Sequence, residues 1–167
     1  MNEFDLSYRM YHDKATLEYW LKAFVKDECI QVCYVAGHGE GGRLCGLERD
    51  INIGPLAQAT RVRSMAKLPK GILFGSCDVG GRLKEFLPTA GRTIQWVGGY
   101  EIPVPWLEST LCDLLFLEYF IKGRRKRKNG AIGTDAIKST HSAVKALQWV
   151  QEDYPMATLC RFVVFER

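Results

Sequence analysis

The sequence predicts an α/β fold, a three-layer α/β/α sandwich in which helices cover both faces of a mainly parallel sheet. Short apolar, β-branched runs alternate along the chain with longer stretches whose apolar residues recur every three or four positions. The first pattern is typical of buried strands and the second of amphipathic helices. Their alternation indicates parallel strands joined by helical crossovers. Neither an internal repeat nor a linker composition interrupts the pattern, so residues 1–167 are expected to form one domain.

The elements expected in the first part of the chain follow from these periods. Residues 5–11 favour an edge strand, and the apolar residues of 14–26 fall on one face of a helix. The run CIQVCYVA over 29–36 is continuously apolar and too short for a helix, which predicts a strand covered on both faces. A glycine-rich loop, a short INI strand over 51–53 and a helix over 56–68 are expected to follow.

The second part of the chain continues the alternation. GILFGS and TIQWVGG are two further buried runs, and Pro105 stands where the first turn of a helix tolerates proline. The expected elements are strands over 71–76 and 93–99, a helix from Pro105 to about Ile121, a loop over 122–130, a helix over 135–150 and a last strand over 160–166.

Composition limits the class of protein. Hydrophobic residues make up 47% of the 167 residues and charged residues 25%, which is the balance of a globular domain. No apolar run approaches the roughly 20 residues of a membrane-spanning helix, and MNEFDLSYRM lacks the features of a secretory signal. We therefore expect a cytoplasmic protein with no membrane association. Its cysteines are expected to be reduced; four lie in or beside apolar segments: Cys29, Cys33, Cys112 and Cys160.

Two of the expected strands are followed by residues whose side chains can act as a base or as a nucleophile. The strand over 29–36 continues into GHGEGG, which contains His38, and the strand over 71–76 continues into CDVGG, which begins with Cys77. Functional groups of open parallel sheets gather beyond the carboxyl ends of the strands. If the two strands are neighbours, His38 and Cys77 face each other across one crevice, where a base can activate a thiol.

Two cofactor interpretations of the glycine-rich segment fit less well. Gly37, Gly39 and Gly42 match G-x-G-x-x-G, but RLCGLERDINIGP follows instead of a helix, and no carboxylate stands about 20 positions on. A zinc site is the second alternative, with ligands drawn from Cys29, Cys33, His38 and Cys45, although their spacings match no common zinc module. We therefore expect no cofactor and no metal.

The paired blocks also carry a family resemblance. A strand ending in His-Gly, IQVCYVAGHG, followed by a strand ending in Ser-Cys, GILFGSC, resembles the caspase-like cysteine peptidases, and most closely their bacterial CHAT-type branch. The resemblance extends from about residue 4 over nearly the whole chain and implies a caspase-like sheet. The core of this family usually begins with one further strand and helix, which we expect this chain to lack, as a fragment or as a variant with a shortened sheet.

The resemblance implies a Cys-His dyad, with Cys77 as nucleophile and His38 as general base and acid. The backbone N–H groups of Gly39 and Cys77 would form the oxyanion hole. Gly75 stands where caspases carry glutamine and metacaspases aspartate, so neither substrate preference carries over. The candidates for a substrate pocket are Arg9, Glu40, Gly75, Ser76, Asp78 and Tyr100.

At the level of function, the resemblance implies a cysteine endopeptidase that hydrolyses peptide bonds through an acyl-enzyme. It further implies a regulated bacterial protease, of a kind found in defence systems, with a protein or peptide substrate and a regulatory partner protein or domain. The alternative from a different class is a catalytically inactive module of the same fold that serves protein interaction.

One basic run sets the charge of the chain. KGRRKRK over 122–128 holds six of the 23 basic residues, and the remaining 17 face 19 acidic ones. We expect a solvated loop between two helices. The family resemblance adds a further option, a processing or docking site formed by Arg124, Arg125, Lys126, Arg127 and Lys128. Nucleic-acid binding through this run is a further alternative, but it is not favoured, because no aromatic residues are interleaved for base stacking.

Overall fold

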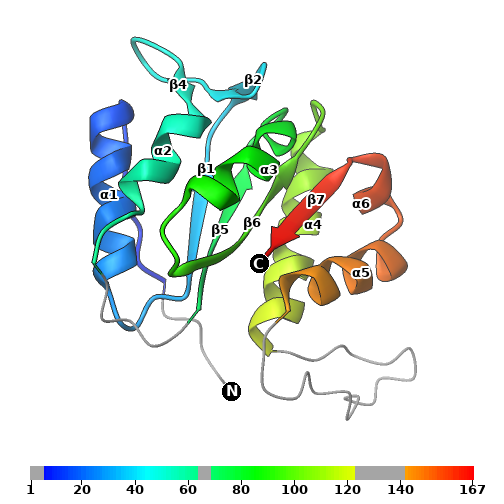
Figure 1. Cartoon of the computed structure of the whole chain (residues 1–167). Coiled ribbons are helices and arrows are strands. Elements are labelled where there is room, and N and C mark those ends of the chain that lie inside the picture. Colours follow the sequence, from blue (N-terminus) through cyan, green and yellow to red (C-terminus); the bar gives the residue numbers. More distant parts are fainter. Residues whose placement is uncertain (1–5, 64–68, 123–141) are drawn as a thin grey trace.

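The protein is built on a central four-stranded sheet with the strand order β1-β5-β6-β7. The computed structural model describes residues 6–63, 69–122 and 142–167 (Figure 1). β1, β5 and β6 are parallel, whereas β7 pairs antiparallel with β6. This arrangement confirms the predicted α/β fold with a mainly parallel sheet. The strands are β1 (Val32–Ala36), β5 (Lys70–Gly75), β6 (Ile94–Tyr100) and β7 (Phe162–Glu166).

Helices cover both faces of this sheet and complete the expected three layers (Figure 1). Successive residues of a strand point to opposite faces, so Ile72 and Phe74 join the core under one helical layer, whereas Leu73 joins the core under the other. The first layer contains α1 (Lys14–Lys26), α2 (Ile53–Ala59) and α3 (Gly80–Thr89). The second contains α4 (Trp106–Lys122), α5 (Ala143–Asp153) and α6 (Met156–Leu159).

A small antiparallel sheet, of which only the INI strand was predicted, lies at the carboxyl end of β1 (Figure 1). It consists of β2 (Gly39–Glu40), β3 (Arg43–Leu44) and β4 (Ile51–Asn52). Gly41 and Gly42 form the turn between β2 and β3 with φ angles of +57° and +76°. Glycine adopts this left-handed region without a steric penalty. The glycine-rich segment is therefore a hairpin, and two of its glycines are explained by that turn.

Several element boundaries differ from the prediction. Residues 6–11 form no strand, and the helix expected over 56–68 begins at Ile53 and ends at Ala59. α3 was not predicted, because two glycines at its start and Pro88 in its last turn weaken the helical pattern. Gly80 is needed there, since a β-carbon would stand 2.7 Å from the Tyr100 carbonyl carbon. The start of α3 therefore packs directly on the end of β6.

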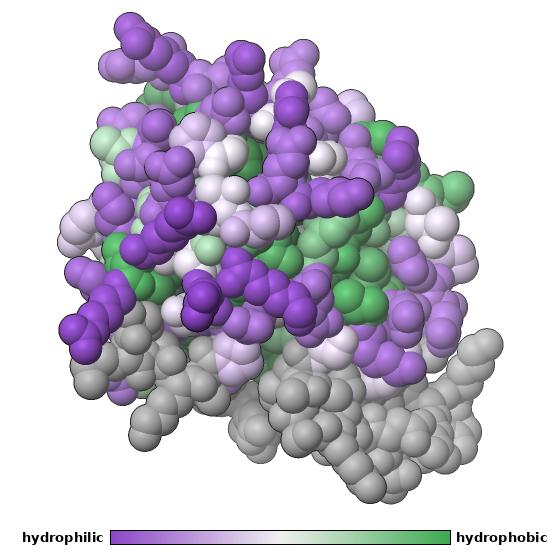
Figure 2. All heavy atoms as spheres, in the orientation of Figure 1, coloured by the Kyte–Doolittle hydropathy of each residue, from purple (hydrophilic) through white to green (hydrophobic). Residues whose placement is uncertain are grey.

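β1 is an edge strand rather than the fully covered strand that its apolar sequence predicts. Among the described residues it pairs with β5 alone, and Tyr34 is 45% exposed. The prediction of cover on both faces was wrong, because Tyr34 and Ala36 on one face of the strand are exposed, which a continuous apolar run does not reveal. Figure 2 shows the side of the molecule seen in Figure 1, which is largely hydrophilic with a hydrophobic area right of the centre of the view.

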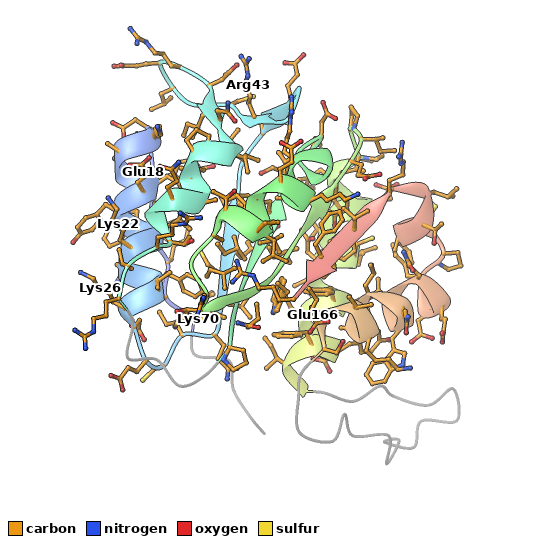
Figure 3. The ribbon with its side chains drawn as sticks, in the orientation of Figure 1. Glu18, Lys22, Lys26, Arg43, Lys70 and Glu166 are labelled. Atoms are coloured by element: carbon orange, nitrogen blue, oxygen red, sulfur yellow. The ribbon has the colours of Figure 1, made fainter. Side chains whose placement is uncertain are left out.

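Two charged side chains near strand ends fix neighbouring elements (Figure 3). Lys70, fully buried at the start of β5, donates from Nζ to the carbonyl oxygens of Asp27 and Ile30, and its ammonium lies 4.8 Å from the centre of the Phe24 ring. Burial lowers the pKa of Lys70. Glu166 at the end of β7 accepts a 2.8 Å hydrogen bond from the Ser142 hydroxyl, beside the first backbone N–H groups of α5.

No helix among the described residues has both the length and the apolar character to cross a membrane.

Candidate active site

The register of β1 and β5 places the two predicted catalytic residues at equivalent positions. Ala36 and Gly75 are opposite each other in the parallel pair, and both strands end there. His38 follows the first strand by two residues, and Cys77 follows the second by two. The sequence prediction that these strands are neighbours is confirmed, and their two loops leave the same edge of the sheet side by side.

The two loops are in direct backbone contact at Gly39. A β-carbon at this position would lie 2.1 Å from the carbonyl oxygen of Cys77 and 3.1 Å from a methyl carbon of Val79. A side chain of any size would force the two loops apart, because the nearest atom belongs to the backbone and has little freedom to move. Gly39 therefore allows the loop of His38 to approach the loop of Cys77 closely.

Substitution of Gly39 by alanine should separate these loops. We expect the free energy of unfolding to fall by about 1–3 kcal/mol, the usual cost of overpacking. Urea denaturation of Gly39→Ala measures the change. Gly81→Ala is the matched control: no atom lies within 4 Å of a β-carbon there, and alanine favours the interior of a helix. Equal stabilities of the two variants would contradict the close approach at Gly39.

Asp78 joins the same two loops through its side chain. Its carboxylate accepts a 2.7 Å hydrogen bond from the backbone N–H of Gly41, and its own N–H donates to the carbonyl oxygen of Ile102 at 3.3 Å. The residue has a φ of +56°, an uncommon conformation that aspartate tolerates better than most residues. Asp78, predicted as a pocket residue, thus braces the loops that carry His38 and Cys77.

The thiol of Cys77 lies against the loop that follows β6. Its sulfur is 3.6 Å from the carbonyl oxygen of Val104 and 3.4 Å from the backbone nitrogen of the same residue. The sulfur therefore faces one acceptor, the Val104 carbonyl oxygen, and one donor, the Val104 backbone N–H. This N–H could also donate to the sulfur of a thiolate. Cys77 is half-buried, so its sulfur is reached from solvent only in part.

His38 is exposed in the loop between β1 and β2. Its backbone carbonyl accepts a 2.8 Å hydrogen bond from the N–H of Cys45, which fixes the main chain beside the hairpin of β2 and β3. No hydrogen bond within the described ranges involves the His38 ring. The ring is therefore not held in one orientation by hydrogen bonds to other described residues.

At Gly75, the space that a side chain would need is filled by Tyr34, a residue that the sequence analysis did not identify. A β-carbon at Gly75 would lie 2.0 Å from the hydroxyl oxygen of Tyr34 on the adjacent strand. The phenol of Tyr34 therefore occupies the space that a side chain at position 75 would need. Only the register of β1 against β5 reveals this, because Tyr34 lies 41 positions earlier in the chain.

The phenol of Tyr34 belongs to a polar cluster with the buried residues Asp113 of α4 and Tyr100 of β6. Both tyrosine hydroxyls donate to the Asp113 carboxylate, each at 2.7 Å, and Tyr100 also reaches the carbonyl oxygen of Ser109 at 2.8 Å. Burial raises the pKa of Asp113 to about 6, although the two hydrogen bonds oppose this shift. Burial and the neighbouring carboxylate raise the pKa values of Tyr34 and Tyr100.

The remaining predicted pocket residues lie in different surroundings. Tyr100 is fully buried within this cluster, and Ser76 is 2% exposed, with a hydroxyl that has no hydrogen-bond partner in the described part of the chain. Glu40 is exposed on β2. The guanidinium carbon of Arg9 lies 5.5 Å from the centre of the Trp20 ring on α1, and the guanidinium donates to the carbonyl oxygen of Tyr8. The contacts of Arg9 are therefore with the N-terminal part of the chain.

Two further sequence interpretations bear on the site. The basic residues predicted as a processing or docking loop, Arg124 to Lys128, lie outside the described residues. The zinc alternative gains no support from the described ranges, in which no three His, Cys, Asp or Glu side chains are grouped as metal ligands. Cys29 precedes β1 whereas His38 follows it, so the strand itself separates these two proposed ligands.

Comparison with known proteins gives no relative for this chain: no family model, no curated protein and no solved structure matches it.

Proposed function

We propose that the protein is a cysteine endopeptidase of the caspase-like class, with Cys77 as nucleophile and His38 as general base and acid. The observation that carries the proposal is the parallel pairing of β1 with β5, in which Ala36 lies opposite Gly75. This register gives His38 and Cys77 equivalent places beyond two adjacent strand ends. The contact of Gly39 with the Cys77 carbonyl supports it further, because the space between the two loops does not admit a side chain at Gly39.

The reaction follows from the chemistry of these two groups. The Cys77 thiolate attacks the carbonyl carbon of a peptide bond, and the C–N bond breaks as His38 transfers a proton to the leaving amine. A thioester with Cys77 results. Water, deprotonated by His38, then attacks the thioester carbonyl, releases the carboxylic acid and restores the thiol. The backbone N–H groups of Gly39 and Cys77 are the proposed donors to the oxyanion of each tetrahedral intermediate.

The proposal predicts a thiol reactivity that exposure does not explain. At pH 7 we expect iodoacetamide to modify Cys77 at least about tenfold faster than Cys29 or Cys45, because an adjacent imidazole increases the nucleophilic fraction. Cys77 is only half-buried, whereas the two reference thiols are exposed, so accessibility alone predicts the opposite order. Peptide mapping by mass spectrometry over a time course gives the three rates within one sample.

The outcome separates the enzyme from its nearest alternative. If Cys77 reacts more slowly than both exposed thiols, and Cys77→Ala does not change the cleavage of a peptide library, the peptidase proposal is wrong. Cys77→Ala adds no polar group and removes only the sulfur, together with its two contacts to the Val104 backbone. A circular dichroism melt of this variant verifies that the fold is retained.

A catalytically inactive module for protein interaction is the second candidate. One observation favours it: the Cys77 sulfur makes its polar contacts with the backbone of Val104, not with His38. In that case Cys77 serves to fix the loop after β6. Thiol reactivity no greater than that of Cys45 would favour this candidate. Two further proposals, a regulatory partner and a role in bacterial defence, rest on the family resemblance alone. Nucleic-acid binding through residues 122–128 rests on the basic sequence alone.

A further inference from the structure

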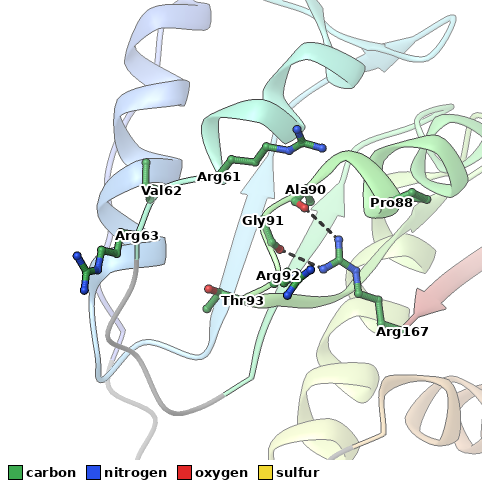
Figure 4. A pocket seen from close by; sticks show the side chains of 9 residues that line it. All are labelled: Arg61, Val62, Arg63, Pro88, Ala90, Gly91, Arg92, Thr93 and Arg167. Carbon is green, nitrogen blue, oxygen red and sulfur yellow. Dashed lines mark hydrogen bonds between the residues drawn. The ribbon is translucent and has the colours of Figure 1, made fainter.

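A pocket of about 590 Å³ lies at the edge of the sheet opposite to His38 and Cys77 (Figure 4). Its walls come from the segment after α2, the turn between α3 and β6, and the residue after β7. These segments flank the amino-terminal end of β6, whereas the candidate dyad lies beyond the carboxyl ends of β1 and β5. The pocket volume is within the range of small-molecule sites. The lining residues are Arg61, Val62, Arg63, Pro88, Ala90, Gly91, Arg92, Thr93 and Arg167.

The lining is strongly cationic. It contains four arginines and neither an aspartate nor a glutamate. None of the ion pairs formed among the described residues involves any of these four arginines. Arginine side chains gathered without an acidic side chain repel one another, so the site gains stability when an anion enters it.

Two of the arginines are held in place by backbone carbonyl groups. Arg61 donates from Nε to the carbonyl oxygen of Thr89 at 2.5 Å. The guanidinium of Arg167 donates to the carbonyl oxygens of Leu87, of Ala90 at 3.0 Å and of Gly91 at 3.4 Å, which lie at the end of α3 and just beyond it. Each guanidinium has five N–H donors, so donors remain for a ligand, and the fixed side chains lose little entropy on binding.

The other two arginines differ in direction. Figure 4 shows Arg61, Arg92 and Arg167 around the turn at Ala90 and Gly91, whereas the side chain of Arg63 is directed away from them. The Arg92 side chain makes no hydrogen bond or ion pair with other described residues. Arg92 is therefore the arginine whose replacement tests binding with the least effect on the fold.

We propose that this pocket binds a small anion that carries two or more phosphate groups. The planar fork of arginine matches pairs of phosphate oxygens and binds them with two parallel hydrogen bonds. Arg61 and Arg92 each retain such a fork, and the charge of Arg167 adds to theirs. Three guanidinium charges around one small pocket favour a multiply charged ligand over a single monovalent ion. A compact pocket on the turn between α3 and β6 favours a small molecule over a protein surface. Inorganic polyphosphates and nucleotides share this chemistry.

Isothermal titration of the full chain with tripolyphosphate, in low salt and without divalent cations, tests the proposal. We expect Arg92→Gln to weaken binding about tenfold, which corresponds to the loss of one charge-assisted hydrogen bond. Arg49→Gln is the matched control, because Arg49 is an exposed arginine outside the pocket, and its affinity should equal that of the unchanged chain. Added ATP distinguishes the sources: tighter binding than tripolyphosphate identifies a nucleotide, and equal or weaker binding a polyphosphate.

Three results would overturn the proposal: no binding of either probe, citrate binding as tightly as tripolyphosphate, or binding that Arg92→Gln leaves unchanged. The last would place the anion elsewhere, for example on the basic run over 122–128. The proposal is independent of the peptidase reaction. Protein whose Cys77 has been alkylated should bind tripolyphosphate with the same affinity, because the pocket and Cys77 lie at opposite edges of the sheet.

Discussion

Replacement of His38 by glutamine should lower the rate of peptide cleavage by about 10²–10⁴-fold, the usual contribution of a general acid–base group. Glutamine is similar in size and polarity but does not exchange protons near neutral pH. Because the His38 ring is exposed and makes no hydrogen bond with other described residues, its loss should change the free energy of unfolding by less than about 0.5 kcal/mol. A fluorogenic peptide selected from a cleaved library gives the rate, and urea denaturation gives the stability.

His12→Gln provides the control for this experiment, because His12 is also exposed but lies before α1. Its cleavage rate should equal that of the unchanged protein. Cleavage retained in His38→Gln would exclude His38 as the base, even if Cys77 proved to be the nucleophile. A large loss of stability in His38→Gln would instead indicate that the residue supports the loop.

The main parts of the fold were predictable because their signals are local. The apolar face of α1 and the continuous apolar runs of β5 and β6 are visible in short windows of sequence, and each run matches a strand to within one or two residues. The position of His38 and Cys77 at strand ends follows from the same runs. Their adjacency required one assumption, that the two strands are neighbours, and the pairing of β1 with β5 confirms it.

What the sequence did not reveal depends on contacts between distant residues. α3 begins with two glycines, which local propensity disfavours, and it forms because Gly80 packs on the backbone of Tyr100. Tyr34 and Asp113 are 79 residues apart, and no periodicity connects them before the sheet is assembled. The arginine pocket combines three separate segments in the same way. Such sites become visible only once register and packing are known.

The cluster around Asp113 adds a carboxyl group to the interior beside the candidate site. Its side chain is 3% exposed and receives hydrogen bonds from Tyr34 and Tyr100. Cys112 lies next to it on α4, and burial raises the pKa of that thiol to about 12. Within the cluster, Asp113 is therefore the group that titrates between pH 4 and 7, where both tyrosines and the thiol stay protonated.

The folded protein should consequently lose stability as the pH rises through the pKa of Asp113. This pKa is raised from 3.8 to about 6, so the folded state holds the proton more tightly than the unfolded chain does. The resulting stabilisation is complete below about pH 4 and disappears as the pH rises above about 6. A shift of about two pKa units corresponds to about 3 kcal/mol. Asp13 and Asp27, whose pKa values are lowered by hydrogen bonds, act in the opposite direction.

Comparison with Asp113→Asn isolates the contribution of this one group. The amide does not titrate, and it keeps an oxygen that accepts from Tyr100, while the half-exposed Tyr34 hydroxyl can turn to accept from the amide nitrogen. Urea denaturation of both proteins from pH 4 to 7 should show the stability difference moving in favour of Asp113→Asn by up to about 3 kcal/mol as the pH rises. A difference that stays constant over this range would mean that Asp113 is already ionised at pH 4, with the two tyrosines compensating fully for its burial.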